Sequence, residues 1–205
     1  VSGRGHHGLN NINHENGFSA FWDAFVAGGN DVTDGVDRNT AGNHLGSYNM
    51  ALSYVSPEWK TRAYFERYFE DQSMLTLQYG IYDHLLGFEV ELPKNPFATF
   101  FVLEHISTKD QSGAVYHDKT ASMPDKMNGR DNYYYHLLYT GWQHWGMALG
   151  HPLITSPIYN ENNVINFRNN RIMAWHFGLN GQPTDELTYR VLLTFTENWG
   201  TYITP

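Results

Sequence analysis

Several stretches of the chain alternate between apolar and polar residues, the pattern of β-strands with one apolar face. In residues 47–54 every second position is apolar, namely Tyr48, Met50, Leu52 and Tyr54. Residues 59–70 alternate in the same way after the short turn Ser56-Pro57-Glu58, and their other face carries Lys60, Arg62, Glu66 and Glu70. The two stretches predict a β-hairpin with one apolar and one polar face.

Two further hairpins follow from the same alternation. Residues 86–92 and 98–107 are joined by a proline-containing turn, and residues 171–179 and 187–197 are joined by the polar turn Gly181-Gln182-Pro183-Thr184-Asp185. In the last hairpin, Tyr189, Val191 and Leu193 share one face. Long hairpins with short turns at one end and long loops at the other are typical of up-and-down β-barrels.

The remaining segments are less regular. We predict an apolar strand over 18–27, aromatic strands over 133–139 and 142–149, and loops over 1–17, 28–42 and 108–129. The whole chain is therefore predicted to be all-β and antiparallel, with about eight to ten strands of a larger barrel. We expect residues 1–205 to form a single domain within that barrel.

The composition favours a membrane-spanning barrel over a soluble sandwich. Aromatic residues make up 16% of the chain and charged residues only 17%, while the mean hydropathy is −0.50. A transmembrane barrel combines a lipid-facing apolar surface with a polar lumen, so its average stays polar. A soluble β-sandwich would also tolerate this composition, although we would expect it to carry more Lys and Glu on its surface. We expect the apolar faces that hold Tyr48 and Tyr189 to contact lipid.

Charge and composition also exclude several classes. The net charge of −8 and the absence of a basic run argue against a nucleic-acid partner, and the absence of Cys removes disulfides and cysteine chemistry. No apolar run is long enough for a transmembrane helix. The start, VSGRGHHG, has the composition of a loop and not of a signal peptide. We therefore expect the chain to be an internal piece of a longer protein.

Catalytic and metal-binding motifs are not found in the sequence. We find no nucleophile elbow, zinc-protease motif or phosphate loop, and the histidines lack the spacing of zinc ligands. The aspartates at 31, 34 and 37 do not fit a calcium loop. We expect no metal and no cofactor. A glycosidase pair drawn from Glu104, Asp118, Asp131 and Glu186 stays open, because sequence does not show how far apart carboxylates lie.

Residues 130–159 hold the most distinctive chemistry, with aromatic rings set among amides, histidines and an arginine. Aromatic rings stack on sugar faces and polar side chains bind hydroxyls, although such rings also serve as barrel girdles or core. Arg130 suits a bidentate contact with a uronate carboxylate. The candidate carbohydrate-binding residues are Arg130, Asp131, Asn132, Tyr134, Trp142, Gln143, His144 and Trp145.

Five segments of the chain resemble the capsule assembly Wzi family in its Bacteroidetes-type form. They are FSAFWDAF, GNHLGSYNMALSY, EHISTKDQSGAVYHD, GRDNYYYHLLYTGWQHWGMALGHPLITSPIYN and GLNGQPTDELTYRVLLTFTENWGTY. The resemblance implies a monomeric outer-membrane β-barrel with an obstructed lumen and more strands than this chain supplies. It also implies a non-catalytic, lectin-like role in binding capsular polysaccharide at the bacterial cell surface.

The sequence thus leads to one expected function and two alternatives. We expect an outer-membrane barrel that binds capsular or exopolysaccharide and helps to attach or assemble the capsule, in contact with outer-membrane lipid. The first alternative is a porin or solute channel with charged rows along an open lumen. The second alternative is a carbohydrate-active enzyme.

Overall fold

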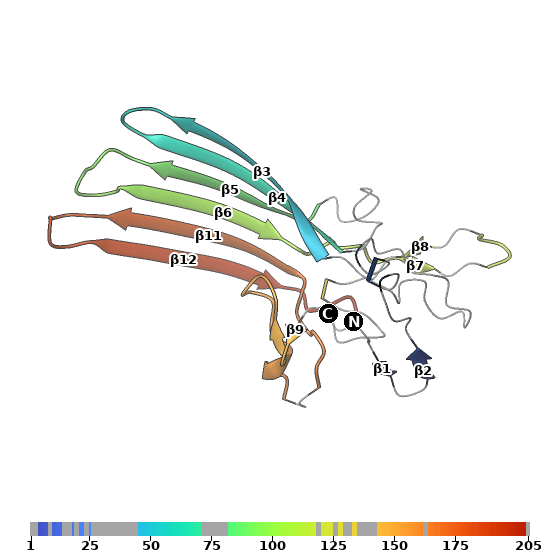
Figure 1. The fold of residues 1–205 in the computed structure, drawn as a ribbon. Coiled ribbons are helices and arrows are strands. Elements are labelled where there is room, and N and C mark those ends of the chain that lie inside the picture. The colour runs from blue at the N-terminus through green and yellow to red at the C-terminus, as the bar shows by residue number, and fades with distance from the viewer. Residues whose placement is uncertain are drawn as a thin grey trace.

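The main body of the protein is one antiparallel sheet of six long strands, in the order β12-β11-β6-β5-β4-β3 (Figure 1). The strands are β3 (Leu45–Val55), β4 (Lys60–Glu70), β5 (His84–Glu91), β6 (Phe100–Ser107), β11 (Ile172–Gly181) and β12 (Tyr189–Asn198). The computed structural model describes residues 4–7, 10–13, 18, 21–22, 25, 45–70, 82–117, 120–124, 127–128, 133–134, 143–161 and 164–203.

The sheet has the predicted up-and-down hairpin arrangement. The β3–β4, β5–β6 and β11–β12 turns lie together at one end of the sheet, which we call the turn end, and the longer connections gather at the other, the loop end (Figure 1). All three predicted hairpins and the mostly antiparallel β architecture are confirmed. The sheet is open, however, because β3 and β12 are its two edges and do not pair with each other. Among the described residues it has six strands, fewer than the eight to ten we predicted.

Short elements occupy parts of the chain that we predicted otherwise. They are β1 (Arg4–His7), β2 (Asn10–Asn13), β7 (Tyr116–His117), β8 (Met127–Asn128), β9 (Gln143–His144), β10 (Met147–Ala148) and the 3-10 turn η1 (Pro157–Tyr159). The loop predictions for 1–17 and 108–129 are wrong where β1 pairs with β2 and β7 with β8. The single strand predicted over 142–149 is instead a small hairpin of β9 and β10, because Gly146 permits a tight turn inside it.

The strand predicted over 18–27 is also wrong at the residues the structure describes. Phe18, Phe21, Trp22 and Phe25 are helical, and their exposed rings contact one another with centroids 5.6 to 6.3 Å apart. Spacings of three, four and seven residues place side chains on one face of a helix, so the helical period outweighs the apolar composition here. Tyr133 and Tyr134 lie in a turn and not in the predicted strand. The rest of 133–139 and the predicted loop 28–42 lie outside the described residues.

The register of the sheet unites the apolar sides of the three hairpins into one surface. Leu52 pairs with Ala63, Ala63 with Phe88, Phe88 with Leu103, and so on through Phe177 to Leu193. Directly paired residues project to the same side of a sheet. We call this side the apolar face; its most exposed apolar members are Tyr48, Met50, Leu52, Tyr54, Leu86, Phe88, Trp175, Leu193 and Phe195.

The opposite side of the sheet, the polar face, carries most of the charged and hydroxyl side chains. Its polar members include Ser47, Asn49, Ser53, Lys60, Arg62, Tyr64, Glu66, Glu89, Glu91, Glu104, His176, Arg190, Thr194 and Thr196. The charged row that we predicted for β4 thus lies opposite the apolar face at Lys60, Arg62 and Glu66. The side chain of Glu70 lies outside what the structure describes.

Loop segments close over the loop end of the polar face. Tyr133, Tyr134, Ile154, Phe167 and Ile172 form a buried core, and Tyr68 and Leu153 pack against it. We call this cluster the loop core. Ile172 is the first residue of β11, and Tyr68 lies near the end of β4 and projects to its polar side. The loop core is therefore attached to the sheet on the polar side. The polar face is therefore covered at its loop end, while the middle of the apolar face is exposed.

Buried hydrogen bonds join the loop ends of β5, β6 and β11. Asp83 is fully buried and accepts hydrogen bonds from the backbone N–H groups of Asp110 and Gln111, at 3.0 and 2.7 Å. Thr108 Oγ1 donates to the carbonyl of Asn170 at 2.8 Å, and Asn170 Nδ2 donates to the carbonyl of Tyr133 at 2.6 Å. This network holds the loop core in place.

Stability should fall as the pH rises from about 4 to about 6, because burial raises the pKa of Asp83 to about 6 from the ordinary 3.8. Between these values the folded state binds more protons than the unfolded state, so the contribution is complete below pH 4 and lost above pH 6. The shift in the pKa of Asp83 corresponds to a change of roughly 3 kcal/mol in the free energy of unfolding. Chemical denaturation from pH 4 to 7 should show this slope, and Asp83→Asn should flatten it. An unchanged slope in the variant would assign the pH dependence to other groups.

Candidate functional site

The β9–β10 hairpin presents the most exposed tryptophan of the described residues at the tip of a tight turn. Gln143 pairs with Ala148 and His144 with Met147, which leaves Trp145 and Gly146 as the two turn residues. Both have positive φ, 52° and 82°, as a type I′ turn requires. Glycine adopts this conformation freely, whereas a bulky residue rarely does. Backbone strain of this kind is concentrated at functional sites.

Three hydrogen bonds hold the hairpin, one within it and two to its surroundings. Gln143 Oε1 accepts from the Gly146 N–H at 2.6 Å, and the Gly146 carbonyl accepts from the Ile158 N–H at 2.8 Å. Ser156 Oγ accepts from the Ala148 N–H at 2.9 Å. Ile158 belongs to η1, so the 3-10 turn supports the back of the hairpin. The tip is therefore held rigidly in a strained conformation.

The rings at this tip face outward. Trp145 is 84% exposed, and the His144 ring meets it edge-on with centroids 6.1 Å apart. Ile158 is also exposed, and its Cβ lies 3.1 Å from the position that a Cβ on Gly146 would take. We call His144, Trp145 and Ile158 the Trp145 surface. A rigid, flat, amphipathic ring beside a histidine is suited to stacking on a ligand while the polar ring nitrogens form hydrogen bonds.

The structure separates the predicted carbohydrate-binding residues into three groups. Gln143, His144 and Trp145 come together in the hairpin, Gln143 as its internal support. Tyr134 is only 8% exposed and packs on Phe167 in the loop core, so it serves the core and not this surface. The other four residues lie outside the described residues: Arg130, Asp131, Asn132 and Trp142.

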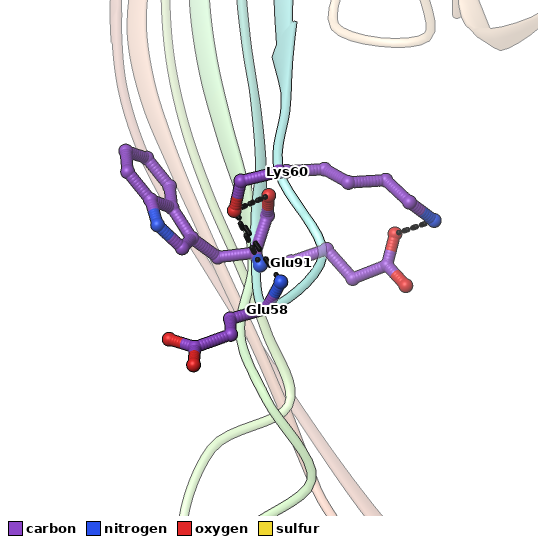
Figure 2. Close-up of polar contacts among 5 residues, drawn as sticks. Glu58, Lys60 and Glu91 are labelled. Carbon is purple, nitrogen blue, oxygen red and sulfur yellow. Dashed lines mark hydrogen bonds and ion pairs between the residues drawn. The ribbon is translucent and has the colours of Figure 1, made fainter.

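The polar face carries a ladder of paired charges toward the turn end. Lys60 Nζ pairs with Glu91 Oε2 (Figure 2), and the two atoms lie 3.0 Å apart. Arg62 lies 3.8 Å from Glu89. The Arg62 guanidinium also lies over the Tyr64 ring, and Tyr64 donates a hydrogen bond to Glu104. The two ion pairs join β4 to its neighbour β5, and the Tyr64–Glu104 hydrogen bond reaches across β5 to β6, so alternation along one strand did not reveal these contacts. The register of the sheet defines them.

Toward the loop end, the same face is acidic and meets a histidine from the loops. Burial lowers the pKa of His151, while Glu104 and Glu66 act on it in the opposite direction and His176 in the same one. His151 therefore lies within electrostatic range of both glutamates. Glu186, a predicted partner for a glycosidase pair, lies in the β11–β12 turn and not beside Glu104 in β6. Asp118 and Asp131 lie outside the described residues.

Comparison with protein-family models, curated proteins and solved structures found no match for this chain. Among the residues that the structure describes, no group of three or more His, Asp or Glu side chains is placed to hold a metal ion. The same part of the chain contains no helix long and apolar enough to cross a membrane. The candidate site is thus defined by its own geometry, an exposed Trp145 surface beside a sheet with chemically distinct faces.

Proposed function

We propose that the six-stranded sheet is part of the wall of an outer-membrane β-barrel, with its apolar face against lipid. The continuous exposed apolar face supports this, because soluble proteins rarely expose so large an apolar surface. The lengths of β3, β4, β11 and β12, 10 or 11 residues each, also agree with it. Strands of this length, tilted by about 40°, cross the roughly 25 Å apolar band of an outer membrane.

Within this barrel, we propose a non-catalytic, lectin-like function in which the Trp145 surface binds capsular or exopolysaccharide. The observation that carries this proposal is the outward-facing Trp145 on a strained, hydrogen-bonded turn. Short turns of outer-membrane barrels face the periplasm and long loops face the exterior. The loop end, which includes the Trp145 surface, would then meet polysaccharide at the cell surface and help to attach it, as the resemblance to the Wzi family implies.

Trp145→Ala should weaken binding of purified capsular polysaccharide by roughly five- to tenfold, since loss of one stacked ring costs about 1–1.5 kcal/mol. Binding is measured on the detergent-folded protein against an extract from an acapsular strain. The matched control is Trp59→Ala, which removes a tryptophan at the turn end of the sheet. Equal binding by Trp145→Ala and the parent protein would contradict the assignment of the Trp145 surface.

The charge ladder of the polar face favours a second candidate, a solute channel. Lys60, Arg62, Glu89 and Glu91 would line the lumen of a barrel whose apolar face meets lipid. Single-channel conductance in planar bilayers separates the two functions. An open channel should conduct steadily and respond to Arg62→Gln, whereas a barrel obstructed by its loops should conduct poorly.

A further inference from the structure

Two cationic side chains lie together at the loop-side border of the apolar face. Lys109 follows β6 and Arg171 precedes β11. Backbone pairing continues past the strand ends, because the Thr108 N–H donates to the Ile172 carbonyl. In the same way, the Trp199 N–H donates to the Arg171 carbonyl. Lys109 and Arg171 have the same parity along their strands as Ser107 and Met173 of the apolar face. They therefore extend this face by one row beyond Ser107 and Met173.

Aromatic rings hold both cations. Lys109 Nζ lies 4.3 Å from the centre of the Trp199 ring, and Arg171 Cζ lies 3.8 Å from the centre of the Tyr202 ring. Arg171 Nε donates to the Lys109 carbonyl at 2.8 Å, and Tyr202 donates to the Asp110 carbonyl at 2.6 Å. The segments after β6, before β11 and after β12 thus form one interlocked set. We call these four side chains, Lys109, Arg171, Trp199 and Tyr202, the border site.

The rings attract the cations without neutralising them. The ion pairs between described residues join Lys60 to Glu91, Arg62 to Glu89 and Lys94 to Asp185, and none includes Lys109 or Arg171. A π face attracts a cation through its quadrupole and carries no net charge, so both positive charges persist. The acidic groups nearby are Asp83, Asp110 and Glu197. The oxygens of Asp83 accept hydrogen bonds from two backbone N–H groups.

We infer that the border site binds the phosphate of a membrane lipid headgroup. The inference rests on the proposed membrane-spanning role. If lipid covers the apolar face, its headgroups lie near the row of Lys109 and Arg171, because the face turns polar at the preceding row of His84, Ser107, Met173 and Glu197. Tryptophan, tyrosine and basic side chains are the residues that membrane proteins place at this depth. Charge complementarity favours a phosphate headgroup with a net negative charge over a zwitterionic one, since each basic group near an anionic surface contributes about 1 kcal/mol.

The test is native mass spectrometry of the full chain folded in detergent, titrated with phosphatidic acid or phosphatidylcholine. The parent protein should bind phosphatidic acid more tightly than phosphatidylcholine. Lys109→Gln should weaken phosphatidic acid binding roughly fivefold. Lys109→Arg should restore it, because the charge returns and the guanidinium also stacks on the Trp199 ring.

Two further variants serve as controls for overall charge. Lys94→Gln removes the same charge from an exposed lysine at the turn end and should leave phosphatidic acid binding unchanged. Glu197→Gln removes the carboxylate on the apolar side of the border site and should tighten binding. Equal losses in Lys109→Gln and Lys94→Gln would overturn the border site, as would equal binding of the two lipids by the parent protein.

A last arm separates lipid from a free anion. Inorganic phosphate at millimolar concentration should not displace phosphatidic acid, because the acyl chains bind the adjacent apolar face. Displacement would make the border site a general anion site and overturn the lipid assignment. Insertion of the parent protein into liposomes is tested separately. If the parent protein inserts but its binding of phosphatidic acid does not depend on Lys109, the border site alone is refuted. If the parent protein does not insert, the membrane-spanning role is refuted.

Discussion

Replacing Leu52 with arginine is expected to prevent much of the protein from folding into lipid bilayers. Leu52 lies in the middle apolar row of the sheet and is 79% exposed, so the described residues leave a charge placed there largely unshielded. If the apolar face contacts lipid, a basic residue near the bilayer midplane costs about 2–4 kcal/mol. The folded fraction in liposomes, read from heat-modifiable gel migration, should fall sharply.

Ala51→Arg is the matched control, because it adds the same charge one residue away on the polar face. This variant should insert almost as well as the parent protein. If both faces of the sheet were in contact with water, both positions would be solvent-exposed. Both substitutions would then change the free energy of unfolding by less than about 0.5 kcal/mol. Equal behaviour of the two variants would therefore reject a lipid-facing role for the apolar face.

Truncating Ile172 to alanine should destabilise the protein by about 2–5 kcal/mol, because a buried aliphatic side chain is lost and a cavity remains. Ile172 is fully buried in the loop core against Tyr133 and neighbouring rings. Ile172→Val should cost only about 0.5–1.5 kcal/mol. Denaturant unfolding in detergent measures both, and limited proteolysis should show faster cleavage of the loops in the alanine variant.

Ile203→Ala provides the comparison for this prediction, since Ile203 is exposed beyond β12. It removes the same atoms and should change stability little. Equal effects at the two positions would mean that the loop core contributes no specific packing. A large effect at Ile172 alone would show that the loops and the sheet unfold as one unit, which a rigid Trp145 surface requires.

The long strands and their two faces could be predicted from the sequence, whereas the side-chain contacts on the polar face could not. Alternation in 47–54 and 59–70 identified the hairpin, because a period of two is a local property that each strand displays by itself. The Tyr64–Glu104 and Arg62–Glu89 contacts depend on how strands pair, and alternation does not fix the register between strands.

Two misjudged segments show where local patterns compete. Residues 18–25 contain four aromatics, which favours a strand by composition, but their spacing is helical and the structure follows the spacing. At 142–149, the aromatic content obscured the turn signal of Gly146. The border site could not be foreseen either, because its members come from three segments far apart in the chain that only the sheet brings together.

The open edges of the sheet make membrane entry and strand pairing interdependent. Along β3 and β12, the outward N–H and C=O groups have no strand partner among the described residues. In water such groups are hydrated, but in hydrocarbon each unsatisfied group costs several kcal/mol. The penalty over a whole edge is therefore larger than the gain from burying any one row of the apolar face. A sheet of this form enters a bilayer only in the same step in which its edges acquire neighbours, so a catalyst of its insertion must act on the edges.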